Sequence, residues 1–360
     1  MKRSLGFALT ALASALVAYA ALRGTALARR RQAPVTVHFL SMGTIAEVTV
    51  IGGDAERAAE IVRKAFDEVE AAASVFRPDS PVARLNASGS VRLPPVMPGG
   101  FDLAALLRRS LDVARATDGA FDPTVNPLMR LWGFRQDGIP ARQPSDADIA
   151  SALGRVGWTN VVLSAVPGSD VIRAGVEGHP DVELELGGIA TEATDVSFGR
   201  EGMELDLGGI AKGAAVDFAY ERLHMADFTD FLINLGGNIR VSGRPERGRD
   251  NWRVAIRDPA NPSRTTGETV VLGSGEAVAT SGSYERYVEI GGRRFSHIVD
   301  PRTGHPVARQ GSVSVIANTA EEADAYSTAF FVMGLGFEDG GATVFRWFGA
   351  SLTEHVREAR

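Results

Sequence analysis

The 360-residue chain holds 44% hydrophobic and 23% charged residues, which excludes a disordered protein and indicates a globular one with a substantial core and one or two domains. It has no cysteine, so disulfides, thiolate catalysis, cysteine zinc sites and lipid attachment through cysteine are excluded. Of its 38 Lys and Arg, six fall in residues 1–31, where there is no acidic residue, so 32 basic side chains face 44 acidic ones in the rest. This net charge of about −12 argues against nucleic-acid binding, which depends on basic residues that neutralise phosphates.

The first 31 residues differ from the rest. Met1-Lys2-Arg3 precedes an almost uncharged run at 4–22, and arginines follow at 23 and 29–31. This pattern predicts an export signal or a single membrane anchor. Small residues at 18–20 and 26–28 resemble cleavage sites, whereas the apolar run approaches spanning length, so cleavage of the leader is left open.

Two strands and a long helix are predicted next. Residues 35–41 and 44–51 read as strands joined tightly at Met42-Gly43, and 54–73 reads as a helix. The Gly-, Pro- and Ser-rich stretch 86–100 predicts a loop.

A second amphipathic helix is predicted over 101–117, and the sequence Asp-Gly-Ala-Phe-Asp-Pro at 118–123 predicts a sharp turn. Ser145 with Asp148 has the spacing of a helix cap, and 160–207 reads mainly as β-structure.

The remaining pattern decides the fold class. A helix is predicted over 211–225, and short strand candidates alternate with turns over 231–317. Strands and helices do not alternate regularly, which favours an α+β fold, with antiparallel sheets flanked by a few long helices, over a doubly wound α/β sheet.

The last long helix carries two oxygen-bearing side chains on one face. Thr319 and Glu322 have the capping-box spacing and Gly334 suits a C-terminal stop, so Asp324 and Thr328 are one turn apart. They are compatible with an exposed polar edge of a packing helix or with a hard-cation site, since Mg²⁺ prefers such oxygen ligands.

Leu-Asp-Leu-Gly-Gly-Ile-Ala-Lys-Gly at 205–213 predicts a strand that enters a helix through a glycine turn. Such a turn allows close backbone approach to an anion, to which Lys212 would add charge, but an isolated Gly-Gly also fits a plain strand–helix connection. A near-copy at 184–190 is interpreted as a strand within a local insertion near 168–202.

His297 ends a strand candidate before a proline–glycine turn. Histidine is the side chain best suited to proton transfer near neutral pH, although a single histidine at a strand end is also compatible with a structural role.

Seven motifs occur in order along the chain. They are Met-Gly-Thr at 42–44, AFDP at 120–123, LDLGGIAKG at 205–213, INLGGN at 233–238, ATSGSYERY at 279–287, SHIVDPRTG at 296–304 and DAYST at 324–328. Their order and spacing over 36–335 resemble the ApbE family, the FAD:protein FMN transferases.

The resemblance implies an exported, Mg²⁺-dependent enzyme, in the periplasm or anchored in the inner membrane and facing the periplasm. It would cleave FAD, transfer FMN to a threonine or serine hydroxyl of an acceptor protein and release AMP. Water in place of the acceptor would make it an FAD pyrophosphatase, and an FAD-binding protein without turnover is a further alternative.

The resemblance also assigns site residues. Mg²⁺ would be held by the side chains of Asp324 and Thr328 and the carbonyl of Gly209, with Ser327 at the same site. His297 is the candidate for drawing the proton from the acceptor hydroxyl. The FAD site would be lined by Met42, Phe76, Ala120, Phe121, Asp122, Asp206, Lys212 and Ile298.

The sequence departs from the family pattern in three ways. It carries roughly twenty extra residues before the glycine turn, which could alter substrate access, Ala214 where an aromatic residue is usual, and no lipoprotein cysteine. We expect residues 336–360 to pack on the transferase domain formed by 36–335.

Overall fold

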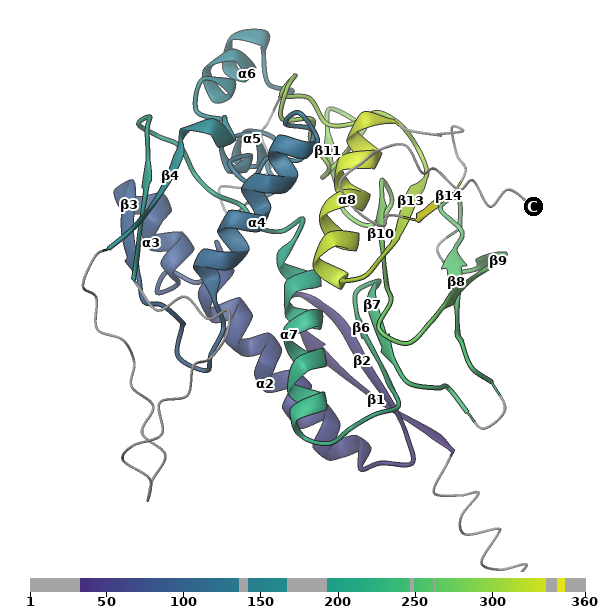
Figure 1. The fold of residues 1–360 in the computed structure, drawn as a ribbon. Helices are drawn as coiled ribbons and strands as arrows, with labels where there is room; N and C mark the ends of the chain where they lie inside the picture. Colours follow the sequence, from purple (N-terminus) through teal and green to yellow (C-terminus); the bar gives the residue numbers. More distant parts are fainter. Residues whose placement is uncertain are drawn as a thin grey trace, which may run out of the picture.

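The computed structural model describes residues 33–135, 142–166, 193–246, 249–261, 263–334 and 342–346. Among these, the centre is a seven-stranded sheet in the order β1-β2-β6-β7-β10-β13-β14 (Figure 1). Its strands are β1 (Pro34–Ser41), β2 (Thr44–Ile51), β6 (Phe231–Leu235), β7 (Asn238–Ser242), β10 (Ala277–Gly282), β13 (Ser312–Ala317) and β14 (Ala342–Arg346). Every neighbouring pair is antiparallel except β13 and β14, so the predicted α+β class is confirmed.

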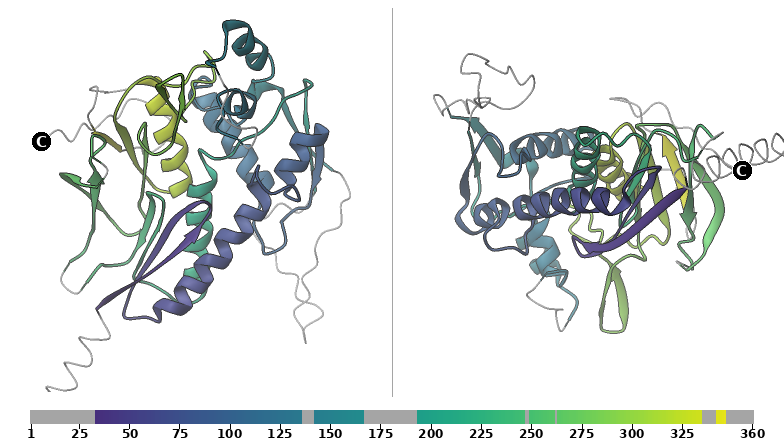
Figure 2. Two further views of the ribbon diagram at one scale, coloured as in Figure 1. Left: turned by 180° about the vertical axis from the view of Figure 1, so that it is seen from behind. Right: turned by 90° about the horizontal axis from the view of Figure 1, so that it is seen from below.

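Three long helices cover one face of this sheet (Figure 2). Helix α2 (Ala55–Ala73) lies on β1 and β2, α7 (Ala211–Met225) on β6 and β7, and α8 (Ala320–Met333) on β10 and β13. All three were predicted within two residues of their ends. Local signals explain this agreement, because the Asp54 side chain accepts a hydrogen bond from the Arg57 amide at the start of α2.

The opposite face of the sheet is covered by the hairpin of β8 (Trp252–Arg257) and β9 (Thr265–Leu272). Neighbouring residues of β10 therefore serve different cores: Ala277 packs in the helix layer, whereas Val278 packs against the hairpin. Burial on both faces explains why β13 is buried at every position along its length.

A smaller sheet lies beyond α2, and the prediction of a loop over 86–100 is wrong for residues 86–93 and confirmed for 94–100. Strand β3 (Ser90–Leu93) pairs with β5 (Thr194–Phe198), which in turn pairs with β4 (Val161–Ala165), and helix α3 (Pro81–Ser88) precedes β3. Ser80 caps α3 and Gly89 ends it with a positive φ, so residues that suit a loop also suit a short helix followed by a turn. The partner of β3 lies about a hundred residues away, and no local pattern reports it.

Several of the remaining elements share a second hydrophobic cluster, which is separate from the main core. Helix α4 (Leu103–Ala116) corresponds to the predicted amphipathic helix, and Ser145 with Asp148 forms the predicted capping box of α6. The others are α5 (Asn126–Leu131), α6 (Asp146–Leu153), η1 (Trp158–Asn160) and the hairpin strands β11 (Tyr287–Ile290) and β12 (Arg293–Ser296).

Several predictions lie outside the described residues: the leader at 1–31, the first glycine motif at 184–190, most of the insertion near 168–202, and most of 336–360. Across the ranges that are described, no helix is long and apolar enough to cross a membrane.

Helices α7 and α8 each hold the first turn of the other. The carboxylate of Asp324, in α8, accepts a hydrogen bond of 3.0 Å from the amide of Gly213, while Asp217, in α7, accepts bonds of 2.8 and 2.9 Å from the amides of Ala320 and Glu321. Because the residue before α7 gives no side-chain cap, Asp324 supplies one from another helix.

Gly213 makes this arrangement possible. A Cβ atom added to it would stand 2.2 Å from the carbonyl oxygen of Ala320 and 2.7 Å from the Cα of Glu321. Backbone atoms cannot yield as a flexible side chain would, so any other residue would force the two helices apart. The glycine thus brings Asp324 to the start of α7.

Candidate active site

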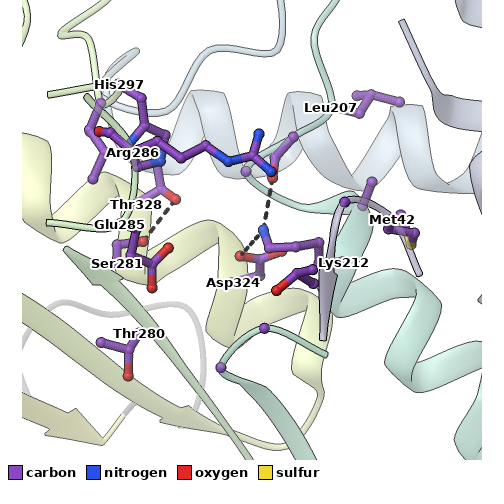
Figure 3. A pocket seen from close by; sticks show the side chains of 18 of the residues that line it. Met42, Leu207, Lys212, Thr280, Ser281, Glu285, Arg286, His297, Asp324 and Thr328 are labelled. Atoms are coloured by element: carbon purple, nitrogen blue, oxygen red, sulfur yellow. Dashed lines mark hydrogen bonds and ion pairs between the residues drawn. The ribbon is translucent and has the colours of Figure 1, made fainter. Parts of the chain in front are cut away.

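One cleft of about 740 Å³ collects most of the predicted site residues (Figure 3). Its walls come from the β1–β2 turn, the end of α2, the loop after α4, the glycine turn before α7, the β10–β11 loop, the segment after β12 and helix α8. Of the thirteen predicted residues, twelve line it: Met42, Phe76, Ala120, Phe121, Asp122, Asp206, Gly209, Lys212, His297, Ile298, Asp324 and Thr328. Ser327 is fully buried and does not line the cleft, so the structure separates it from the others.

Met42 occupies a two-residue hairpin turn at the rim of the cleft. Its φ is +47° and that of Gly43 is +72°, the signs that a type I′ turn requires. Glycine adopts this conformation freely, whereas it costs methionine about 1 kcal/mol or more. The tight β1–β2 register maintains the turn and places Met42 in the cleft wall.

Lys212 and Asp324 form an ion pair at the floor of the cleft (Figure 3). The lysine Nζ lies 3.4 Å from Asp324 Oδ1 and donates a 3.1 Å hydrogen bond to the carbonyl of Gly208. Asp324 is only 4% exposed, so the interpretation of this helix face as an exposed polar edge is wrong. The glycine turn is also more than a plain connection, because its carbonyl and the lysine beyond it both face the cleft.

Hydroxyl groups gather beside this ion pair. Ser281 Oγ lies 2.9 Å from Ser327 Oγ and 3.2 Å from Thr328 Oγ1, and Ser327 donates a 2.9 Å hydrogen bond to the carbonyl of Asp324. Ser327 thus supports the wall from behind, whereas Ser281 and Thr328 face the cleft.

The oxygen donors here suit a hard cation in part. A Cβ added to Gly209 would lie 3.4 Å from Thr328 Oγ1, so the glycine turn closely approaches the hydroxyl near Asp324. No group of three or more His, Cys, Asp or Glu side chains in the described ranges could hold a metal ion. A cation would therefore rest on one carboxylate with hydroxyl and carbonyl oxygens, a sparse set of the kind Mg²⁺ completes with water or phosphate oxygens.

His297 stands at the opposite wall as a neutral imidazole. Its Nδ1 lies 3.1 Å from the carbonyl oxygen of Arg286, and a carbonyl only accepts, so the proton is on Nδ1 and Nε2 is left as the acceptor. Burial, with smaller contributions from the positive charges of Lys212, Arg286 and Arg135, lowers the pKa of His297 to about 4, although the hydrogen bond with the Arg286 carbonyl opposes this shift.

Two other carboxylates of the site are already hydrogen-bonded by protein groups. Asp122 accepts bonds from the amide and hydroxyl of Thr124 and from the amide of Trp158; burial still raises its pKa above the usual value. Asp206 pairs with Arg135, whose guanidinium lies 5.3 Å from the centre of the Phe76 ring. Both aspartates therefore shape the wall rather than offer a free base.

Sequence reasoning did not assign several polar residues of the cleft, among them Arg135, Ser281, Glu285 and Arg286. Three of these four fall in the ATSGSYERY motif, whose composition resembles that of any polar turn, so only its match to the family marked it. Glu285 is exposed as a residue, but the surrounding protein desolvates its carboxyl group and raises the pKa of that group to about 7. The positive charge of Lys212 opposes this rise in pKa, and the negative charge of Asp324 adds to it.

The fold is that of a flavin transferase family. The chain belongs to the ApbE family, whose sequence model matches residues 42–340, as the order of its motifs predicted. It is 33% identical over 298 residues to the FAD:protein FMN transferase of Salmonella typhimurium, covering 82% of this chain and 77% of that protein. It is 28% identical over 329 residues to that of Haemophilus influenzae, covering 90% and 87%.

Solved structures agree. The ApbE protein of Thermotoga maritima matches with a TM-score of 0.66 at 30% identity, covering 84% of this chain and 87% of that one. The flavinyl transferase ApbE of Pseudomonas stutzeri, in its apo form, matches with a TM-score of 0.64 at 28% identity, covering 83% and 84%.

Proposed function

We propose that this protein transfers FMN from FAD to a threonine or serine hydroxyl of an acceptor protein and releases AMP. The observation that carries the proposal is the cleft itself, in which a neutral imidazole faces a floor built from Lys212, Asp324 and the glycine turn. A proton acceptor on one wall and positive charge on the other are what phosphoryl transfer to a hydroxyl requires.

In this reaction the acceptor hydroxyl oxygen attacks the phosphorus of the FMN half of FAD. The new P–O bond replaces the bond to the bridging oxygen, which leaves with AMP, and Nε2 of His297 takes the hydroxyl proton. Lys212 stabilises the negative charge that moves onto the leaving phosphate. Mg²⁺ held by Asp324, Thr328 and the carbonyl of Gly209 would neutralise further phosphate charge.

The test is a mass measurement on three components. The domain from residue 32 onward is incubated with FAD, Mg²⁺ and a candidate acceptor, and the acceptor is weighed. We expect an acceptor heavier by one FMN, together with AMP. Free FMN with an unmodified acceptor would instead identify an FAD pyrophosphatase, and unchanged FAD would identify an FAD-binding protein without turnover.

We further propose that residues 1–31 direct export, so that the enzyme and its acceptor meet in the periplasm or at the periplasmic face of the inner membrane. This proposal is supported by the uncharged run at 4–22, which lies between flanking basic residues. Fractionation of cells that produce the full chain is expected to show it outside the cytoplasm, and recovery in the cytosol alone would refute this assignment.

A further inference from the structure

Arg286 reaches across the cleft from the wall that holds His297. Figure 3 shows its side chain extending toward Leu207, at the glycine turn. Its Nη2 lies 3.3 Å from the point where a Cβ on Gly43 would stand, so the arm also reaches the β1–β2 turn. The guanidinium therefore lies above the floor formed by Lys212 and Asp324.

The other cations nearest the floor are already matched by carboxylates. Lys212 pairs with Asp324 and Arg135 pairs with Asp206. For Arg286, no carboxylate of the described residues lies within ion-pair distance. Arg257 also lines the cleft without such a partner, but it is not among the charges that lower the pKa of His297, whereas Arg286 is. Arg286 is thus an unmatched cation that acts on the group expected to receive the proton.

The main chain of the same residue fixes that group. The carbonyl of Arg286 accepts hydrogen bonds of 3.1 Å from both the amide and Nδ1 of His297. One residue therefore orients the imidazole through its backbone and projects a positive charge into the cleft through its side chain. A substitution of the side chain leaves the backbone contact in place, so the two roles can be tested separately.

We propose that the Arg286 guanidinium binds the phosphate oxygens of FAD beside Lys212 and so positions the diphosphate for attack. This inference rests on the proposed function. A guanidinium presents a planar fork of N–H donors that matches two phosphate oxygens with parallel hydrogen bonds, a geometry that an ammonium group lacks. Binding would also tie the substrate to the loop that orients His297, so phosphate and base would be positioned together.

The experiment compares Arg286→Gln and Arg286→Lys with Arg294→Gln. Arg294 lies on the β11–β12 hairpin, which Arg286 directly precedes; it pairs with Glu289 at 4.0 Å and does not line the cleft, so it is a matched control. The dissociation constant of FAD is measured by flavin fluorescence at several NaCl concentrations, with kcat and KM for transfer, and thermal melts without ligand verify folding.

We expect Arg286→Gln to weaken FAD binding roughly tenfold to a hundredfold, the range for hydrogen bonds to charged groups, and to flatten its dependence on salt. Arg286→Lys should keep the salt dependence and recover part of the affinity, and Arg294→Gln should match the wild type. Wild-type binding and salt dependence in Arg286→Gln would overturn the inference, as would equal losses in the Gln and Lys variants with an unchanged salt slope. A wild-type protein that binds FAD but transfers no FMN would refute the proposed transfer instead.

Discussion

Replacement of Asp324 by asparagine is expected to lower the rate of FMN transfer by at least about a hundredfold at saturating FAD, because it removes the anionic ligand of a cation that offsets phosphate charge. Asparagine keeps the shape of the side chain and an oxygen that can accept the bond from Gly213, so the fold is expected to survive. The measurement is the mass of the acceptor over time at increasing Mg²⁺ concentration.

Two further variants sharpen this test. Glu322→Gln makes the same change of charge on the same helix but outside the cleft, and is expected to leave transfer unchanged. Thr328→Val removes one neutral oxygen that water can replace, so added Mg²⁺ should partly restore its rate but scarcely restore that of Asp324→Asn. A wild-type dependence on Mg²⁺ in Asp324→Asn would end the assignment of Asp324 as a metal ligand.

Replacement of His297 by glutamine is expected to lower transfer about a hundredfold to ten-thousandfold, the contribution of a positioned general base, while FAD binding changes less than about twofold. His305→Gln is the control, since His305 follows in the same loop and does not line the cleft. Comparable losses of transfer rate in both variants would show that transfer depends on the conformation of the loop rather than on the imidazole of His297.

The expected pH dependence of kcat/KM follows from the protonation of His297. Because the pKa of His297 is lowered to about 4, its imidazole is neutral throughout the range from pH 8 to pH 5.5, and kcat/KM should lose this base only as the pH falls toward 4. The profile is measured in the wild type and in Glu285→Gln, which removes the neighbouring carboxyl whose pKa is raised to about 7. A loss of kcat/KM centred near 6.5 in Glu285→Gln would contradict the assignment.

The lowered pKa also affects stability. As the pH falls, His297 of the unfolded chain is protonated near its usual pKa of 6.5, whereas His297 of the folded protein is protonated only near 4. The free energy of unfolding therefore has the full contribution of the neutral His297 above pH 6.5, and loses it as the pH falls from 6.5 to 4.

The parts of the fold that sequence predicted are those with local signals. Asp54, Ser145 and Thr319 cap helices through their own side chains, and Gly334 ends α8 with φ +72°. The pairing of β3 with β5 and the burial of Asp324 depend instead on chain segments about a hundred residues away. The helical period places Asp324 and Thr328 on one face but does not show whether that face meets water or another helix.

The candidate site likewise contains residues that the sequence predicted and residues that only the folded structure shows. Twelve of thirteen residues assigned through the family resemblance line the cleft, because the glycine turn, the β1–β2 turn and α8 form where their motifs lie. Ser327 lies behind the wall, where its hydroxyl contacts Ser281 and the carbonyl of Asp324; the helical spacing that puts it near the face of Asp324 does not show this depth. Arg135 and Arg286 were not predicted as site residues, because a single arginine in a loop belongs to no periodic pattern or motif. Only the folded structure shows where the end of such a long side chain lies.

The mutual capping of α7 and α8 couples the local unfolding of the two helix starts. Fraying of the first turn of α8 would free the carboxylate of Asp217, which sits beneath that turn, and fraying of α7 would release Asp324 from Gly213. Each event leaves a buried charge with fewer partners, so the two ends should open together as one cooperative unit, and their amide hydrogens should exchange with solvent at similar rates. The floor of the cleft then stays intact or is lost as a whole, and a half-assembled site is scarcely populated.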